Sequence, residues 1–364
     1  MERARAEASV VLPTPGTSSI RRWPRATSPI TARRTTSGLP TRARPTLSSR
    51  RRMISVEPPI EFHYTVRGFF PRAARSPAVV VCHPMDRPNP SEPGGAWASG
   101  DAASGWKRGE AARGRALDPL TELMLDLAGV TVGSQVLDLG AGTGDQTMLA
   151  ARRAGPGGMV LATDISASML ALTQQAARDA DLANVQTRVM DAQRLELEAD
   201  SFDAAMARFS LQFVPDVPRA LAEVRRVLKP GGRFAAAVFS AIERNSFRAS
   251  PQAIASRLAG KPFPAPGPGQ WALNDPSTLR DAFRRAGFRD VDVRPVPFVY
   301  RFQSLADALR NLAEAQPPLV KLLDELSEDD RVTAWAEIER TLEPFVGPDG
   351  FAAPSEALIT VGAR

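Results

Sequence analysis

Short apolar runs alternate with amphipathic segments along most of the chain after Trp106. Before the first run, apolar residues recur every three or four positions, which predicts an amphipathic helix that buries Leu117, Leu120, Leu123, Met124 and Leu127. Apolar runs then predict strands over 135–140, 158–164, 185–191, 202–209 and 233–240. Helical spacing predicts helices between them over 145–155, 166–181 and 217–228. Strands that alternate with helices indicate crossover connections and a parallel sheet, so the predicted class is α/β.

The regular alternation pauses after Ser240, where a helix over 247–260 and a Pro/Gly-rich loop are predicted. It resumes with a helix that begins after Asp275, an N-cap residue followed by Pro276 in the first helical position. A strand over 288–302, helices over 304–315 and 330–342 and a last strand over 356–364 complete the prediction. We expect the helical inserts, at about 241–270 and 302–350, to form a lid.

Charge is distributed unevenly along the chain. Residues 1–52 hold twelve arginines against Glu2 and Glu7, a net charge of +10, which leaves −4 for the rest of a chain whose total is +6. An acidic body disfavours a general electrostatic grip on phosphate, so we expect no nucleic-acid partner.

The first hundred residues are rich in Arg, Ser and Pro and show little periodicity. Such a segment cannot bury enough apolar area to offset its ordering entropy, so 1–100 is predicted to be a disordered extension and 101–364 the folded domain. The scarcity of Lys indicates a GC-rich coding sequence, in which an over-extended reading frame would yield the same tail, and Met53 is a candidate internal start. The alternative is a mitochondrial or plastid targeting segment.

Several classes of site are disfavoured by composition. The chain has one cysteine, Cys82, and two histidines, His63 and His83, so neither an internal disulfide nor a metal-ligand cluster is expected. Cys82 and His83 are adjacent, and neighbours on a strand face opposite ways, so we do not assign them as a nucleophile pair. No continuous apolar run is long enough to span a membrane, and a cytoplasmic location is expected.

The stretch LDLGAGTGD, residues 137–145, carries the first chemical signal. A strand that ends in Gly140, Gly142 and Gly144 and opens a helix brings bare backbone and free amides close to a ligand. The dinucleotide pattern G-x-G-x-x-G would place its third glycine at Asp145, and Asp138 would repel a pyrophosphate. A zwitterionic ligand that carries an ammonium group, such as S-adenosylmethionine (SAM), suits this loop better.

Two more acids end the next predicted strands. Asp164 closes the second strand, where a carboxylate can accept hydrogen bonds from both ribose hydroxyls, and Asp191 closes the third, where it can accept one from the adenine amine. Ligands of open α/β sheets bind outside the carboxyl ends of the strands, so these acids and the glycine loop should converge on one crevice.

The stretches VLDLGAGTGD, ATDIS, LAEVRRVLKPGGRF and the segment from Met190 to Asp216 resemble class I SAM-dependent methyltransferases. The resemblance is to the broad branch that includes the ubiquinone/menaquinone biosynthesis C-methyltransferases. It implies a Rossmann-like sheet of seven strands, mostly parallel with the last strand antiparallel, and helices on both faces. It also implies that 101–364 is a methyltransferase domain.

The resemblance further implies which residues contact the cofactor, SAM. Asp138 and the glycines would shape the methionine pocket, Asp164 would hold the ribose, and Asp191 with Ala192 would contact the adenine. The whole implied set is Asp138, Gly140, Ala141, Gly142, Gly144, Asp164, Ile165, Met169, Asp191, Ala192, Arg208 and Phe209.

Methyl transfer from a sulfonium needs mainly proximity and orientation, and no catalytic base is assigned. Arg208 is a candidate to stabilise a phenolate or enolate, with a plain salt bridge as its alternative role, and Gln212 and Asn245 are weaker candidates. Aromatic residues outside the cofactor half indicate a small hydrophobic or aromatic acceptor, methylated at carbon or oxygen; they are Trp106, Trp271, Phe298, Tyr300 and Trp335.

Three alternatives to this activity remain. The first is an RNA or protein methyltransferase, which is disfavoured because ARFSLQ stands after the fourth strand in place of an N-P-P-Y-type tetrad. The other two are a SAM-binding protein without turnover and a nicotinamide-dependent oxidoreductase.

Overall fold

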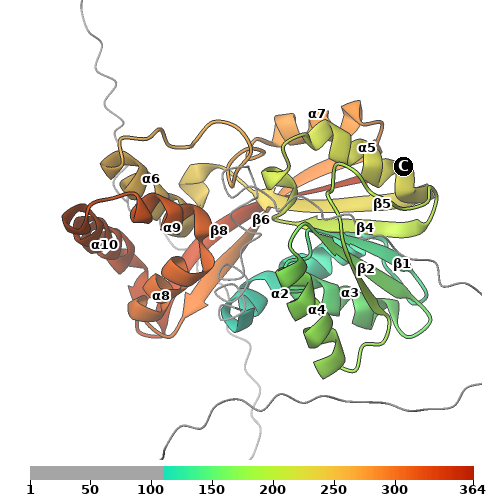
Figure 1. The fold of residues 1–364 in the computed structure, drawn as a ribbon, viewed down its shortest axis with the longest axis horizontal. Helices are drawn as coiled ribbons and strands as arrows, with labels where there is room; N and C mark the ends of the chain where they lie inside the picture. Colours follow the sequence, from blue (N-terminus) through green and yellow to red (C-terminus); the bar gives the residue numbers. More distant parts are fainter. Residues whose placement is uncertain (1–109) are drawn as a thin grey trace, which may run out of the picture. The chain divides into compact units, whose positions relative to one another are not determined.

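The computed structural model describes residues 110–364 (Figure 1). The predictions for the extension at 1–100, Met53, the Cys82–His83 pair and Trp106 concern positions outside this range. Within it, helices and strands alternate as the hydrophobic pattern predicts, from α2 (Glu110–Ala128) to β8 (Gly350–Ala363). No helix among the described residues is long and apolar enough to cross a membrane.

One sheet organises the fold. Its strands follow the order β3-β2-β1-β4-β5-β8-β6, and the short β7 pairs with β8. The neighbours from β3 to β5 are parallel, and β8 runs antiparallel to β5 and to β6. The strand bounds are β1 Gln135–Leu139, β2 Met159–Asp164, β3 Val185–Val189, β4 Phe202–Arg208, β5 Leu228–Phe239, β6 Arg289–Phe302 and β7 Val346–Gly347. The predicted Rossmann-like sheet with an antiparallel last strand is confirmed.

Helices cover both faces of the sheet, and α2, α3 and α4 lie on the face opposite α5 and α7 (Figure 1). Alternate strand residues explain this division, because Val136 points to the face covered by α2 and Leu137 to the face covered by α5. The bounds are α3 Asp145–Ala154, α4 Ala167–Asp179, α5 Val217–Val227, α6 Ser246–Leu258, α7 Pro276–Arg285, α8 Leu305–Ala315, α9 Pro317–Asp324 and α10 Glu328–Leu342.

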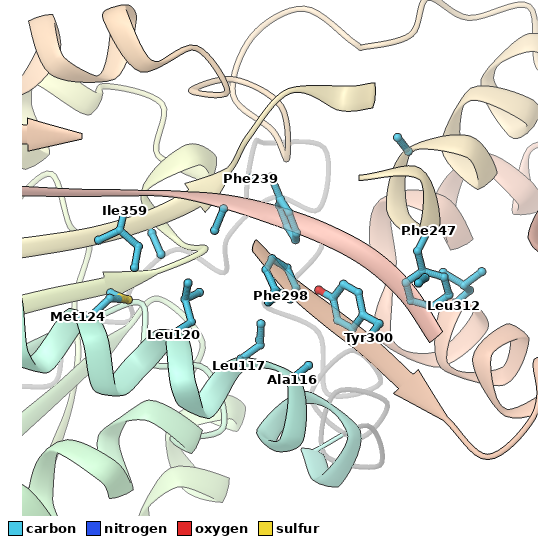
Figure 2. Close-up of a cluster of buried hydrophobic side chains, with 14 of the residues drawn as sticks. Ala116, Leu117, Leu120, Met124, Phe239, Phe247, Phe298, Tyr300, Leu312 and Ile359 are labelled. Carbon is cyan, nitrogen blue, oxygen red and sulfur yellow. The ribbon is translucent and has the colours of Figure 1, made fainter. Parts of the chain in front are cut away.

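The amphipathic stripe of α2 packs as predicted. Leu117, Leu120 and Met124 are buried, and Leu123 and Leu127 are partly buried against the same core. Figure 2 shows Leu117, Leu120 and Met124 lying beneath Ile359 of β8, with Leu117 beside Phe298 of β6. The apolar positions of α2 are therefore the ones that pack against the part of the sheet formed by β5, β8 and β6.

The helices α6, α8, α9 and α10 pack together beside the long β6–β8 ribbon (Figure 1). Phe247 of α6 anchors them, because its ring lies 5.1 Å from that of Tyr300, 5.5 Å from Phe302 and 5.4 Å from Phe351. These helices lie within the two predicted inserts.

Some boundaries differ from the prediction. Strand β5 begins at Leu228 rather than at 233, because Leu228 pairs with Phe202 of β4. Strand β8 begins at 350 rather than 356 because its first residues pair with the end of β6. The short α9 and β7 were not predicted, since two prolines open α9 and β7 holds only two residues.

Candidate functional site

A cavity of about 310 Å³ opens at the carboxyl edge of the sheet. The last residues of four strands line it: Leu139 of β1, Asp164 of β2, Arg208 of β4 and Phe239 of β5. It therefore lies where open α/β sheets bind their ligands.

The cavity brings together most of the predicted cofactor residues. Those that line it are Gly140, Ala141, Gly142, Asp164, Ile165, Met169, Asp191, Ala192, Arg208 and Phe209. Asp138, which belongs to β1, and Gly144, which ends the glycine loop, do not line it. Gln212 also faces the cavity, while Asn245, Trp271, Phe298 and Trp335 lie outside its lining.

Close packing against Ser210 and Thr173 partly determines the backbone conformation of the glycine loop. Gly140 has a φ of +70°, and a Cβ at this position would lie 2.4 Å from the Cβ of Ser210. Gly144 has a φ of +89° and faces Thr173 in the same way, at 2.7 Å from its Cγ2. Both glycines are thus required by internal packing as well as by backbone conformation.

Asp164 fastens the glycine loop to the end of β2. Its Oδ2 accepts a hydrogen bond of 2.9 Å from the Gly142 amide, and its Oδ1 accepts one of 2.9 Å from the Ser166 amide. Burial raises the pKa of this carboxyl above its ordinary value, against the lowering effect of those two amides. Each oxygen keeps capacity for a further donor from the cavity.

Asp191 lies two residues beyond the end of β3 and is exposed. The backbone amide of Gln193 donates to its Oδ1 at 2.8 Å, and the Gln193 side chain donates to both oxygens, at 3.0 and 2.9 Å. The carboxylate is held in place at the rim of the cavity.

Asp138 is fully buried and turned toward helix α3. It accepts hydrogen bonds from Thr147 Oγ1 at 2.5 Å and from Gln146 Nε2 at 3.2 Å. Burial raises its pKa to about 6, because the desolvation of the carboxylate outweighs these two hydrogen bonds. Asp138 thus connects β1 to α3 behind the loop.

A pH-dependent stability follows from Asp138. Its pKa is higher in the folded protein than the ordinary 3.8, so its contribution is present below about pH 4 and is lost as the pH rises through about 6. The loss amounts to about 3 kcal/mol at neutral pH. Compared with Asp138→Asn, the wild type should therefore lose unfolding free energy between about pH 3.5 and 6.5, measured by urea unfolding. A difference between the two proteins that does not change with pH would contradict this.

Arg208 forms a buried ion pair with Asp145, at 3.6 Å between Nη2 and Oδ2. Its Nη1 donates a hydrogen bond of 2.7 Å to Thr121 Oγ1 on α2. Asp145 lines the cavity and was not among the predicted site residues, although it stands where a dinucleotide fold would carry its third glycine. The charge of Arg208 is therefore balanced within the cavity wall.

The far end of the cavity is formed by aromatic and amide side chains. Phe209 stacks on Phe239 with ring centroids 4.3 Å apart, and Tyr300 of β6 also lines the wall. Gln212 is fully buried there, and neither polar atom of its side chain has a hydrogen-bond partner among the described residues. Arg248, Gln270 and Gln316 complete this end, and no motif in the sequence marked them.

Comparison with known proteins bears on this arrangement. Residues 137–236 match the family described as Methyltransferase domain. The chain contains a class I SAM-dependent methyltransferase domain. A ubiquinone/menaquinone biosynthesis C-methyltransferase of Bordetella parapertussis is 43% identical over 117 residues, which cover 32% of this chain and 45% of that protein.

A second relative of the methyltransferase domain is the nocamycin O-methyltransferase of Saccharothrix syringae. It is 32% identical over 193 residues, which cover 48% of this chain and 65% of that protein. The chain thus spans about half to two thirds of the length of these relatives. A solved SAM-dependent methyltransferase from Aquifex aeolicus is also similar, with a TM-score of 0.41, 20% identity, and coverage of 53% of this chain and 91% of that one.

The cofactor of this class is SAM, and the charges of the cavity fit it. Asp145, Asp164 and Asp191 line the half that contains the glycine loop, and Arg208 balances only one of them. SAM carries a sulfonium and an ammonium against a single carboxylate, so an acidic wall complements its net positive charge.

Proposed function

We propose that the protein transfers a methyl group from SAM to a small hydrophobic or aromatic acceptor, at a carbon or an oxygen atom. The observation that carries this is the single cavity that joins the glycine loop and the strand-end acids to an aromatic far end. Bound SAM supplies a methyl group activated by a sulfonium, which a nucleophilic atom of an acceptor can displace.

The cofactor would be held by the predicted residues that line the cavity. Asp164 has free lone pairs that can accept hydrogen bonds from the ribose hydroxyls. Asp191 and Ala192 would contact the adenine. The Gly140–Gly142 backbone would meet the methionine part. Asp138, which lies behind the loop, would act by positioning α3 rather than by contact.

The aromatic walls support the choice of acceptor. Phe239 and Tyr300 belong to the ends of β5 and β6, beyond the cofactor half, and present apolar faces to the cavity. Flat apolar acceptors gain burial and stacking energy from such walls. The names of the two relatives given above are consistent with both carbon and oxygen as the methylated atom.

Two measurements test this function. Isothermal titration should show saturable binding of SAM and none of NAD. Radiolabelled SAM incubated with the protein and a cell metabolite extract should then transfer label to an organic-soluble small molecule. Binding of NAD without SAM would refute the proposal, and label transferred to RNA or protein would favour the macromolecular alternative.

A further inference from the structure

Besides Gln212, three residues that line the far end of the cavity carry a buried hydrogen-bond donor without a partner. The donors are Nε of Arg248, Nε2 of Gln270 and Nε2 of Gln316, and none of them has an acceptor among residues 110–364. The three residues are 5%, 8% and 1% exposed, and all three line the cavity. Unpaired buried donors are costly, so they indicate a ligand that supplies acceptors.

The orientation of the two glutamines is fixed by a neighbour that can only donate. The indole N–H of Trp271 donates to Oε1 of Gln252 at 3.0 Å. The Gln252 amide nitrogen must then donate, and it does so to Oε1 of Gln270 at 2.9 Å and to Oε1 of Gln316 at 3.2 Å. Both glutamines therefore have their oxygens engaged and their NH2 groups left as donors.

Arg248 adds a positive charge that is not balanced. Its guanidinium carbon lies 5.0 Å from the ring centroid of Tyr300, and its Nη1 donates a long bond of 3.4 Å to the Ala315 carbonyl. No acidic side chain in the described part of the chain forms an ion pair with it, whereas Arg208 has Asp145. A buried cation without a counter-charge is expensive, so a bound anion would be strongly favoured there.

We infer that the methyl acceptor carries a carboxylate, bound by Arg248 together with Gln270 and Gln316. Two carboxylate oxygens offer about four acceptor sites, enough for three donors, and bring the missing negative charge. Phe239 and Tyr300 would cover the apolar part of the same molecule. This assignment rests on the proposed methyltransferase function and names its substrate class.

The site lies apart from the cofactor half in the fold. Arg248 belongs to α6, Gln270 to the loop that follows it, and Gln316 to the junction of α8 and α9. All three come from the segments after β5 and β6, whereas the glycine loop and the strand-end acids come from β1 to β3 and the loops that follow them. The proposed carboxylate site and the proposed cofactor site are therefore built from different parts of the chain.

The test uses benzoate as a probe and benzamide as its neutral match. Binding is measured by calorimetry on the full chain saturated with S-adenosylhomocysteine. Wild type should bind benzoate saturably and benzamide at least about tenfold more weakly, since a hydrogen bond to a charged group contributes that much. Arg248→Gln should weaken benzoate binding at least about tenfold, and Arg248→Lys should weaken it less, because it keeps the charge.

Arg257→Gln is the matched control. Arg257 lies on the same helix, is exposed, and pairs with Glu337, so its loss should leave benzoate binding unchanged. SAM affinity of Arg248→Gln should match the wild type, which separates this site from the proposed cofactor site.

Three results would overturn the inference: no saturable benzoate binding by the wild type, equal binding by Arg248→Gln, or benzoate binding that occurs only when S-adenosylhomocysteine is left out. Failure of the wild type to bind SAM would instead refute the proposed function.

Discussion

Asp164→Ala is expected to weaken SAM binding by about 100-fold or more. The carboxylate is the group proposed to accept hydrogen bonds from the ribose, and hydrogen bonds to a charged group contribute about 1.5–3 kcal/mol each. The same side chain holds the amides of Gly142 and Ser166, so its removal also releases the loop that the cofactor would contact. Titration calorimetry with SAM measures the loss directly.

Asp216→Ala is the control for a general loss of stability. Asp216 also accepts a backbone amide hydrogen bond, from Arg219, as the N-cap of α5, but it does not line the cavity. Loss of this cap should cost about 1 kcal/mol of unfolding free energy and leave SAM affinity unchanged. If both variants lower SAM affinity equally, or if neither does, Asp164 is not a cofactor ligand.

Much of the fold could be predicted because its signals are local. The parallel strands β1, β2 and β4 are short apolar runs. Helices begin at residues that cap them, as Ser166 does for α4 and Asp275 for α7. The early start of β5 could not be predicted, since its first residues are held by pairing with β4 and not by their own preference.

The two halves of the cavity differ in how far the sequence predicts them. Acids at the ends of neighbouring parallel strands must meet at one edge, so topology alone places Asp164 and Asp191 together. Arg248, Gln270 and Gln316 come together only through the packing of α6, α8 and α9, which no period in the sequence specifies. Asp138 was predicted to shape the methionine pocket because of its position in the motif. That position did not reveal that its side chain turns toward Thr147 of α3.

Gly140→Ala is expected to destabilise the protein by about 3 kcal/mol or more and to abolish SAM binding. A left-handed backbone costs an alanine about 1–2 kcal/mol. The added Cβ would also lie 2.4 Å from Ser210 Cβ and 2.8 Å from Ser210 Oγ, so the loop or the end of β4 must move. Ser210 Oγ donates a 2.6 Å hydrogen bond to the Leu139 carbonyl, which resists that movement. Urea unfolding measures the loss.

Gly129→Ala separates the two costs. Gly129 has a φ of +74°, and nothing lies within 4 Å of a Cβ placed there, so this variant should lose only the conformational part. If Gly140→Ala is no more harmful than Gly129→Ala, the contact with Ser210 is not decisive.

The double variant Gly140→Ala/Ser210→Gly tests the same contact from the other side. Removal of the Ser210 side chain makes room for the new Cβ, so the double variant should recover about 1–2 kcal/mol relative to the sum of the single changes. SAM binding by the double variant then shows whether glycine is needed at position 140 for packing against Ser210 or for contact with the ligand. If stability returns and SAM still binds, Gly140 is required by the packing of Ser210; if stability returns without binding, it is required by the ligand.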